Sequence, residues 1–199
     1  MSREREGRER VLLQAHTLFL ERGFAEVSMQ QIADAVGMTK ASLYYHFRNK
    51  EDLFAHVVKY ETERMIQGIR SELDGVDSFE EQLMRLACFA FTVLRTDMGR
   101  LMSDCKRYLG NGRHWHDFDG DHLDPIGVLR PYFERAQATG ELRPIDLDTA
   151  IIAFVSMIVG ALKVGEEHPE VMRPGPQEAE TLVDLFLRGA LARSPALRP

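Results

Sequence analysis

The chain has 199 residues, 44% of them hydrophobic, which is enough to bury the core of a compact soluble fold. Its formal net charge of -6 argues against a protein that coats nucleic acid without selectivity. The first 53 residues hold eight basic and eight acidic side chains, so the acidic excess lies entirely in the remaining residues. The net charge is therefore compatible with a local basic site within the first 53 residues.

The charged start and the cysteine content narrow the class of protein further. The opening MSREREGRERV has no apolar stretch of the kind found in a secretory signal, so a cytoplasmic protein is expected. Cys88 and Cys105 are too few for a disulfide framework and lack the paired spacing of a structural zinc site. The longest apolar run, residues 150–162, is shorter than the roughly 18 residues of a membrane span, and it predicts a helix buried on all sides.

Nearly every segment has the apolar spacing of helices rather than the alternation of strands, which predicts an all-α fold. The apolar stripe of the first helix ends just before Gly23, a residue suited to a left-handed cap. The second helix begins with a capping box formed by Ser28 and Gln31, and it stops at Gly37. This pattern predicts a long helix followed by a short one.

A third and a fourth helix follow directly. Thr39 caps the third, which runs through KASLYYHF, and Asn49 starts the fourth with Asp52 at its third helical position. Two short helices joined by VGMT after a longer one are typical of a helix-turn-helix.

The third helix carries side chains suited to a DNA duplex. Leu43 and Phe47 lie four residues apart and are expected to pack against the second helix, which leaves the opposite face for DNA. Side chains near the start of the third helix are expected to meet base edges, and the hydroxyl and cationic groups after them are expected to bind phosphates. The predicted DNA contacts are Gln30, Thr39, Lys40, Ala41, Ser42, Tyr44, Tyr45, His46 and Lys50.

Residues 23–53 resemble the DNA-binding domain of the TetR (tetracycline repressor) family of bacterial transcriptional regulators. The resemblance rests on the Gly-Phe entry, Ile-Ala in the second helix, the Gly turn, the LYYHF of the recognition helix and the Lys-Glu opening of the fourth helix. It covers about a quarter of the chain and implies a homodimer with a helical domain that binds a small effector. Val27 and Ala41 depart from the residues usual in the family, and Ala41 bears on the operator sequence.

The sequence predicts two domains, a helix-turn-helix DNA-binding domain at 1–53 and a helical effector-binding and dimerisation domain at 54–199. A long fourth helix is expected to join them. Apolar stripes at 79–94 and 98–109 predict two further helices, and Asp124-Pro125 is expected to open another that Gly140 closes.

The last two helices are expected to form the dimer interface, because no further helix is left to cover their apolar faces. Gly160 is expected to allow close approach of a partner helix. The alternative is an internal core in a monomer. The predicted interface residues are Ile152, Val155, Val159, Leu182, Val183, Phe186, Leu187 and Ala190.

The segment at 109–125 is rich in histidine and aspartate. Asp117, Asp119 and Asp121 have the spacing of the first ligands of a calcium loop, but the positions that need Gly and Glu hold His122 and Val128, which excludes that loop. A transition metal on His114, His116 and His122 stays an alternative, although the spacing fixes no geometry. A solvated connection or the rim of a pocket is favoured, and no metal or cofactor is predicted.

Soft apolar side chains of the middle helices, together with aromatic residues and one histidine of that segment, are expected to form a site for a hydrophobic effector. The alternative is that they are ordinary core residues. The predicted effector site comprises Met84, Cys88, Phe91, Met98, Met102, Cys105, Trp115, His116 and Phe118.

The predicted function is that of a ligand-responsive repressor that binds a palindromic operator as a homodimer and is released by a small effector. Three alternatives stay open: a DNA-binding repressor without an effector, a metal-responsive regulator, and a hydrolase. The hydrolase would use Cys105 as nucleophile and His116 with Asp119 or Asp121 as base, but the sequence has no nucleophile elbow and no strand scaffold. An enzyme is therefore not predicted.

Overall fold

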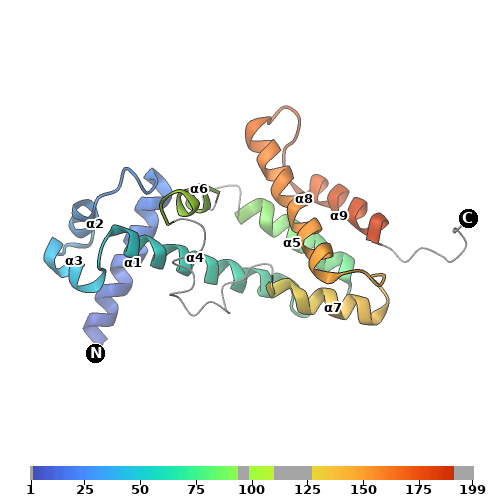
Figure 1. The fold of residues 1–199 in the computed structure, drawn as a ribbon, viewed down its shortest axis with the longest axis horizontal. Coiled ribbons are helices and arrows are strands. Elements are labelled where there is room, and N and C mark those ends of the chain that lie inside the picture. The colour runs from blue at the N-terminus through green and yellow to red at the C-terminus, as the bar shows by residue number, and fades with distance from the viewer. Residues whose placement is uncertain (1, 94–98, 110–126, 191–199) are drawn as a thin grey trace, which may run out of the picture. The chain divides into compact units, whose positions relative to one another are not determined.

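The computed structural model describes residues 2–93, 99–109 and 127–190 (Figure 1). Those residues form helices and connecting turns and contain no strand, so the predicted all-α class is confirmed. The chain divides into two compact units, one of residues 1–64 with 96–123 and the other of residues 65–95 with 124–199. This division concerns packing, and the predicted functional boundary at residue 53 stays a prediction.

The first unit contains the three N-terminal helices and a segment from the middle of the chain. Its core includes a cluster of three aromatic rings, in which the Phe54 ring lies 5.1 Å from that of Phe19 and 4.7 Å from that of Phe24. Its elements are α1 (Ser2–Arg22), α2 (Met29–Val36), α3 (Lys40–His46), the first part of α4 (Lys50–Leu73), α6 (Gly99–Asp104) and a π-helical turn, η2 (Cys105–Leu109).

The ends of α1 and α2 follow from local chemistry, as predicted. At the start of α2, the Ser28 hydroxyl accepts the backbone N–H of Gln31 and the Gln31 side chain accepts the backbone N–H of Ser28. Gly23 and Gly37 have φ values of 82° and 67°, in the left-handed region that a side chain disfavours. The predicted capping box and both predicted glycine ends are confirmed.

The caps of α3 and α4 are confirmed in the same way. Thr39 accepts the backbone N–H of Ser42 through its hydroxyl at 3.1 Å, and Asn49 accepts the backbone N–H of Asp52 at 2.7 Å. The Asp52 carboxylate in turn accepts the backbone N–H and the guanidinium of Arg48. Burial alone would raise the pKa of Asp52, but these hydrogen bonds hold it below its usual value.

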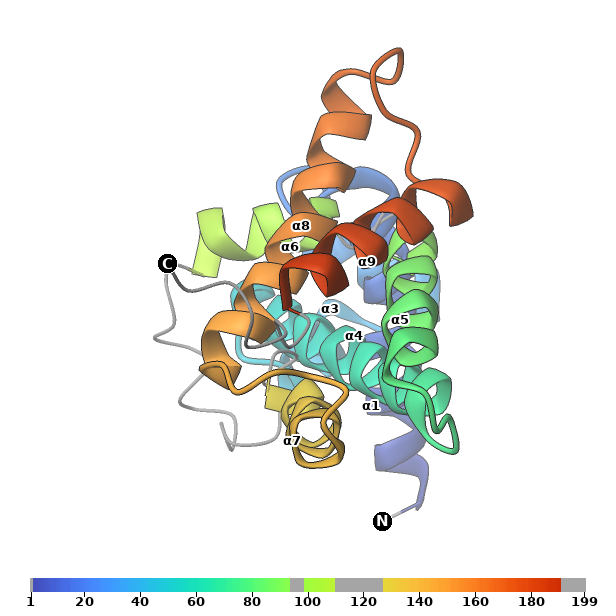
Figure 2. The ribbon, with the colours of Figure 1, turned by 90° about the vertical axis from the view of Figure 1, so that its right-hand side faces the viewer.

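The second unit packs its helices around a core that includes Phe133, Phe154 and Phe186. Figure 2 shows α9 crossing α5 and α8, which it contacts. Its elements are the last part of α4, α5 (Phe79–Val93), a short 3-10 turn η4 (Gly127–Leu129), α7 (Arg130–Thr139), α8 (Leu147–Glu167) and α9 (Pro176–Ala190).

The predicted helices of this part agree with the structure at several ends. Helix α5 lies within the predicted stripe at 79–94, and Gly140, with a φ of 82°, follows the last residue of α7 as predicted. Asp124-Pro125 lies outside the described residues.

One prediction for α8 does not hold within the single chain. The apolar run was expected to be buried on all sides, but Ile152 and Val159 expose 52% and 50% of their surface in the single chain. Among the described helices α8 alone is long and apolar enough to cross a membrane, a property that core helices of soluble proteins share. Its opposite face, with Ile151, Phe154 and Ile158, belongs to the core of the second unit.

Candidate functional site

Helix α3 divides into a buried face and an exposed face. Leu43 and Phe47 are buried in the core of the first unit, together with Ile32 of α2. On the outside, Tyr44 is 44% exposed and Tyr45 is 74% exposed. The predicted orientation of this helix is therefore found in the structure, with polar and aromatic groups on its outer face.

The start of α3 presents a small polar patch. Lys40, Ala41 and Ser42 are exposed, and the Thr39 and Ser42 hydroxyls are 2.8 Å apart, which leaves little freedom to their positions. The Lys40 ammonium lies 5.9 Å from the centre of the Tyr44 ring. A small side chain at Ala41 between polar neighbours lets a duplex approach the helix closely.

The remaining predicted contacts of α2 and α3 have partners within the unit. Gln30 is exposed and donates a hydrogen bond to the Asp34 carboxylate at 2.7 Å. His46 is half-buried and stacks edge-on against Tyr45, with ring centres 5.5 Å apart. A Cβ atom at Gly7 of α1 would lie 3.5 Å from the Nε2 atom of His46, so α1 lies directly against the end of α3.

Lys50 has an environment that the sequence did not suggest. Its ammonium donates to the carbonyl oxygens of Phe24 and Val27, each at 2.7 Å, and lies 3.5 Å from that of Ala25. Burial lowers the pKa of Lys50, while the nearby Glu51, Asp104 and Glu26 oppose that shift. Its predicted contact with phosphate stays a prediction, and the observed geometry gives the side chain a structural role in the turn after α1.

Sequence reasoning missed two arginines of α1 that bind the helix-turn-helix. The Arg8 guanidinium lies 4.9 Å from the centre of the Phe47 ring, and Arg10 donates to the carbonyl oxygen of Val36 at 3.1 Å. Both contacts join residues 26 or more positions apart, so local spacing could not reveal them. Arg48, two residues after the end of α3, has an 85% exposed side chain. The sequence could have suggested it as a DNA contact, because it lies close to Lys50 in a basic stretch.

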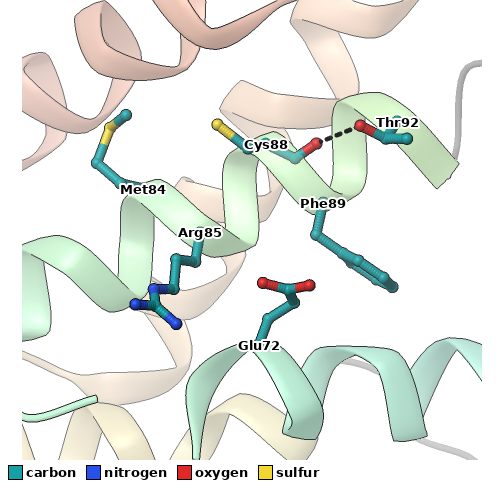
Figure 3. Close-up of a pocket in the computed structure, with 6 residues that line it drawn as sticks. All are labelled: Glu72, Met84, Arg85, Cys88, Phe89 and Thr92. Atoms are coloured by element: carbon teal, nitrogen blue, oxygen red, sulfur yellow. Dashed lines mark hydrogen bonds between the residues drawn. The ribbon is translucent and has the colours of Figure 1, made fainter.

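A groove in the second unit contains two of the predicted effector residues. Figure 3 shows its lining, in which Glu72 of α4 faces side chains of α5. The groove has a volume of about 370 Å³, which lies within the common range for small-molecule sites. Its lining residues are Glu72, Met84, Arg85, Cys88, Phe89 and Thr92.

The groove is amphipathic. Arg85 is bound by Glu81, with nitrogen-to-oxygen distances of 2.6 and 3.1 Å, whereas Glu72 is half-buried in the lining. Burial and the negative charge of Glu72 raise the pKa of the Cys88 thiol, so it is a neutral, weakly polar group near neutral pH. Gly68 leaves room for Phe89, because a Cβ atom there would lie 2.4 Å from its Cζ atom.

The other predicted effector residues are not gathered in this groove. Phe91 is buried in the core of the second unit, and Cys105 is buried in the first unit, where burial raises the pKa of its thiol. The side chains of Met98, Met102, Trp115, His116 and Phe118 lie outside the described residues. Among the described residues no group of three or more His, Cys, Asp or Glu side chains could hold a metal, and the histidines at 114, 116 and 122 lie outside them.

The predicted dimer residues differ in how far the single chain buries them. Val183 and Phe186 are buried in the core of their own subunit, so the prediction that they lie at the interface is corrected. Leu185, which the prediction omitted, is 57% exposed. Ile152 and Val159 are exposed, Val155, Leu182 and Leu187 are half-buried, and the side chain of Ala190 lies outside the description.

Known proteins that resemble this chain share its helix-turn-helix. Residues 11–57 match the family model of bacterial regulatory proteins of the tetR family, the part of the chain that holds the second half of α1, all of α2 and α3, and the start of α4. The HTH-type transcriptional activator FasR of Mycolicibacterium smegmatis is 33% identical over 86 residues, which cover 43% of this chain and 39% of FasR. The HTH-type transcriptional regulator UidR of Escherichia coli is 28% identical over 147 residues, 72% of each chain.

Solved structures show the same fold over nearly the whole chain. The transcriptional regulator FadR from Bacillus subtilis, solved in complex with stearoyl-CoA, has a TM-score of 0.70 at 15% identity and covers 91% of this chain and 98% of its own. This likeness shows the shared fold, and the family match over the helix-turn-helix together with the curated relatives identifies the chain as a member of the TetR family of bacterial transcriptional regulators.

Proposed function

We propose that this protein is a homodimeric, effector-responsive repressor that reads its operator with α3. The observation that carries the proposal is the exposed face of α3, which combines small, hydroxyl, aromatic and cationic side chains on a helix-turn-helix whose other face is buried. Such a face fits a major groove, where Lys40 and Ser42 meet base edges and the tyrosine hydroxyls meet phosphates. Operator binding places the protein in the cytoplasm, and the proposal requires no catalytic residue.

The proposed dimer is formed by α8 and α9. Their exposed side chains Ile152, Val159 and Leu185 would cost free energy in water, and a second copy of the same face would cover them. A Cβ atom at Gly160 or Gly189 would meet nothing within 4 Å in the single chain, which leaves space for a partner helix. Two copies of α3 related by a two-fold axis fit half-sites about 34–36 Å apart, so the operator is expected to be an inverted repeat.

The proposed effector site is the groove between α4 and α5. Its mixture of apolar, sulfur-containing and charged groups suits an amphipathic molecule, and FadR of Bacillus subtilis, with the same fold, was solved with the amphipathic ligand stearoyl-CoA. An effector lowers operator affinity only if it binds the released state more tightly. A coupling free energy of about 1–3 kcal/mol would change the affinity by roughly 5 to 150 fold.

A selection of DNA sequences tests the proposed function. The purified protein is incubated with a library of random duplexes, and the bound fraction is amplified and sequenced over several rounds. We expect enrichment of an inverted repeat, with half-sites about 10 base pairs or a multiple of this apart. A protein that enriches no sequence from this library would refute operator binding.

The direction of regulation needs a separate assay, because the FasR relative is named an activator. In transcription from a promoter that carries the selected sequence, a repressor lowers the amount of transcript when it is added. An increase would favour activation.

A further inference from the structure

Both backbone polar groups of Phe24 are held by charged side chains from different parts of the chain. The backbone N–H of Phe24 donates to the Asp104 carboxylate of α6 at 2.7 Å, and its carbonyl oxygen accepts the Lys50 ammonium of α4 at 2.7 Å. We call the group formed by Phe24, Lys50, Asp104 and Tyr108 the Phe24 junction. It lies in the turn that leads from α1 to α2.

The ring of Phe24 is held as tightly as its backbone. The Tyr108 ring of η2 lies 4.6 Å from it, the Phe54 ring lies 4.7 Å from it, and the Lys50 ammonium lies 4.2 Å from its centre. Phe24 is buried, with 4% of its surface exposed. Aromatic pairs and a cation over a ring add stabilisation to the burial, so the position of this turn is well defined.

The Phe24 junction fixes the turn between α1 and α2, which sets where α2 begins. Lys50 also donates to the carbonyl oxygen of Val27, the residue before the N-cap of α2. The start of α2 is therefore fixed by a cation whose neighbour is the Asp104 carboxylate. Since α2 and α3 are joined by only three residues, a change at the start of α2 changes where α3 presents its side chains.

Asp104 and Tyr108 reach this turn from a distant part of the sequence. They lie about 80 residues from Phe24, between α5 and α7, two helices of the second unit, yet they pack in the first unit. Residues 105–109 form a π-helical turn, a rare geometry that is frequent at functional sites. The segment at 99–109 is thus bound to the turn at Phe24 within the first unit.

We infer that Asp104 and Lys50 are positioning residues for operator binding: they hold Phe24 from its two sides and thereby set the orientation of α2 and α3, and Lys50 itself binds no phosphate. The inference rests on the proposed operator binding and adds a role for a segment outside the helix-turn-helix. It predicts that loss of the Asp104 carboxylate weakens operator binding, whereas the loss of a negative charge alone would strengthen it.

Substitution of Asp104 distinguishes the two accounts. Removing a carboxylate close to a DNA-binding surface would by charge alone strengthen binding to the polyanion. The junction predicts instead that Asp104→Ala weakens binding to the selected operator by about 5 to 150 fold, in the range of typical coupling free energies. Asp104→Asn retains an acceptor oxygen for the Phe24 N–H, so a much smaller loss is expected.

Glu26→Gln is the matched control. This exposed carboxylate also acts on the Lys50 ammonium, and it lies in the same turn, but it makes no hydrogen bond to Phe24 in the described structure. The control therefore removes a similar charge and leaves the junction intact. We expect operator affinity equal to or slightly above that of the wild type.

The salt dependence of binding decides the role of Lys50. Loss of one phosphate contact reduces the slope of log affinity against log salt by about 0.9. For Lys50→Met we expect weaker operator binding with an unchanged slope. A slope reduced by about this amount would assign Lys50 to phosphate and overturn this part of the inference.

Hydrogen exchange in the free protein tests the junction without DNA. In Asp104→Ala and in Tyr108→Leu we expect faster exchange of the α2 and α3 amides, with exchange of the α8 amides unchanged. Unchanged exchange in α2 and α3 together with unchanged or tighter operator binding would overturn the inference. If the wild type bound no DNA, the proposed function would fail, while the exchange data would still decide whether the junction holds α2 and α3. If Asp104→Ala failed to fold, Tyr108→Leu would give the same comparison, because it removes the ring that packs against Phe24.

Discussion

Glu61 of α4 lies in a largely buried polar contact with His16 of α1. The His16 Nε2 and Glu61 Oε1 atoms are 2.6 Å apart, Arg64 lies 2.9 Å from the same oxygen, and the Glu61 side chain is 11% exposed. Burial alone would raise the pKa of Glu61, but its hydrogen bonds and electrostatic contacts with His16 and Arg64 hold it below its ordinary value. This residue therefore links the packing of α1 and α4 to pH.

The depressed pKa gives a prediction for stability. Because the folded-state pKa lies below the unfolded-state value of about 4.3, the stabilisation is fully present above that pH and is lost as pH falls through the folded-state pKa. We expect Glu61→Gln to lower the free energy of unfolding by about 1–3 kcal/mol at pH 7, with a difference from the wild type that shrinks below about pH 4. Urea unfolding across this range measures it.

Glu63→Gln serves as the control for that experiment. The Glu63 carboxylate is 49% exposed and lies 3.9 Å from the Lys59 ammonium, an arrangement worth less than about 1 kcal/mol. If the two variants behaved alike at every pH, the buried pair would not be a source of stability.

Lys40 gives a residue-scale prediction about specificity. Its exposed position in the first turn of α3 is suited to a base edge, where a good contact contributes about 1–3 kcal/mol of discrimination. In parallel selections we expect Lys40→Ala to change the preferred base at one or two symmetric positions of the inverted repeat. Tyr44→Phe, which removes only a hydroxyl, should weaken binding to all sequences alike. Identical base preferences for Lys40→Ala and the wild type would contradict the assignment.

At the scale of the element, the close approach of α5 to α4 depends on Gly68. A Cβ atom there would overlap the Phe89 ring, so Gly68→Ala should displace that ring from the groove and cost about 1–3 kcal/mol. In a Phe89→Leu background the same substitution should cost less, because the ring is absent. Urea unfolding of the four proteins measures the coupling, and equal costs in both backgrounds would contradict the packing described.

The exposed face of α8 and α9 gives a second prediction at this scale. Ile152→Asp and Gly160→Leu should convert the dimer to monomer at micromolar concentration, because one places a charge and the other a bulky group in the proposed interface. The monomer should stay folded, since both sites are open in the single chain. Analytical ultracentrifugation measures the mass, and circular dichroism measures the helix content.

Val171→Asp is the control for these variants. Val171 is 71% exposed and lies in the turn between α8 and α9, outside the proposed interface. It should leave the dimer intact. Dimers that survive Ile152→Asp and Gly160→Leu would place the interface elsewhere.

The elements whose ends are fixed by local chemistry were the ones that the sequence predicted well. The capping box of Ser28 and Gln31 and the cap at Thr39 join residues three apart, so their spacing is visible in the sequence. The partners of Lys50 lie 23 to 26 residues away, and Asp104 lies 80 residues from Phe24. Such contacts depend on the packed fold, which no local pattern encodes.

The residues of the dimer face were harder to predict from the sequence for a different reason. The apolar stripe of α9 is wide enough to face both the core and a partner, and spacing alone could not assign Val183 and Phe186 to the core. Leu185 was omitted although it follows Leu182 by three residues, a helical spacing that could have revealed it. Similarly, Phe91 is apolar and close in sequence to Cys88, but it points into the core of the second unit.

At the scale of the whole molecule, the proposed function requires two subunits on one duplex. Each subunit supplies one α3, and only the two-fold arrangement relates two such helices to an inverted repeat. The net charge of -6 makes this requirement stronger, because one subunit with an acidic excess has little general affinity for DNA.

Native mass spectrometry of the protein with its selected duplex measures this directly. We expect two subunits, or four as a pair of dimers, on each duplex, and for Ile152→Asp no complex at the same protein concentration. A single subunit bound to each duplex, or an Ile152→Asp complex of wild-type stoichiometry, would contradict operator binding by a two-fold dimer.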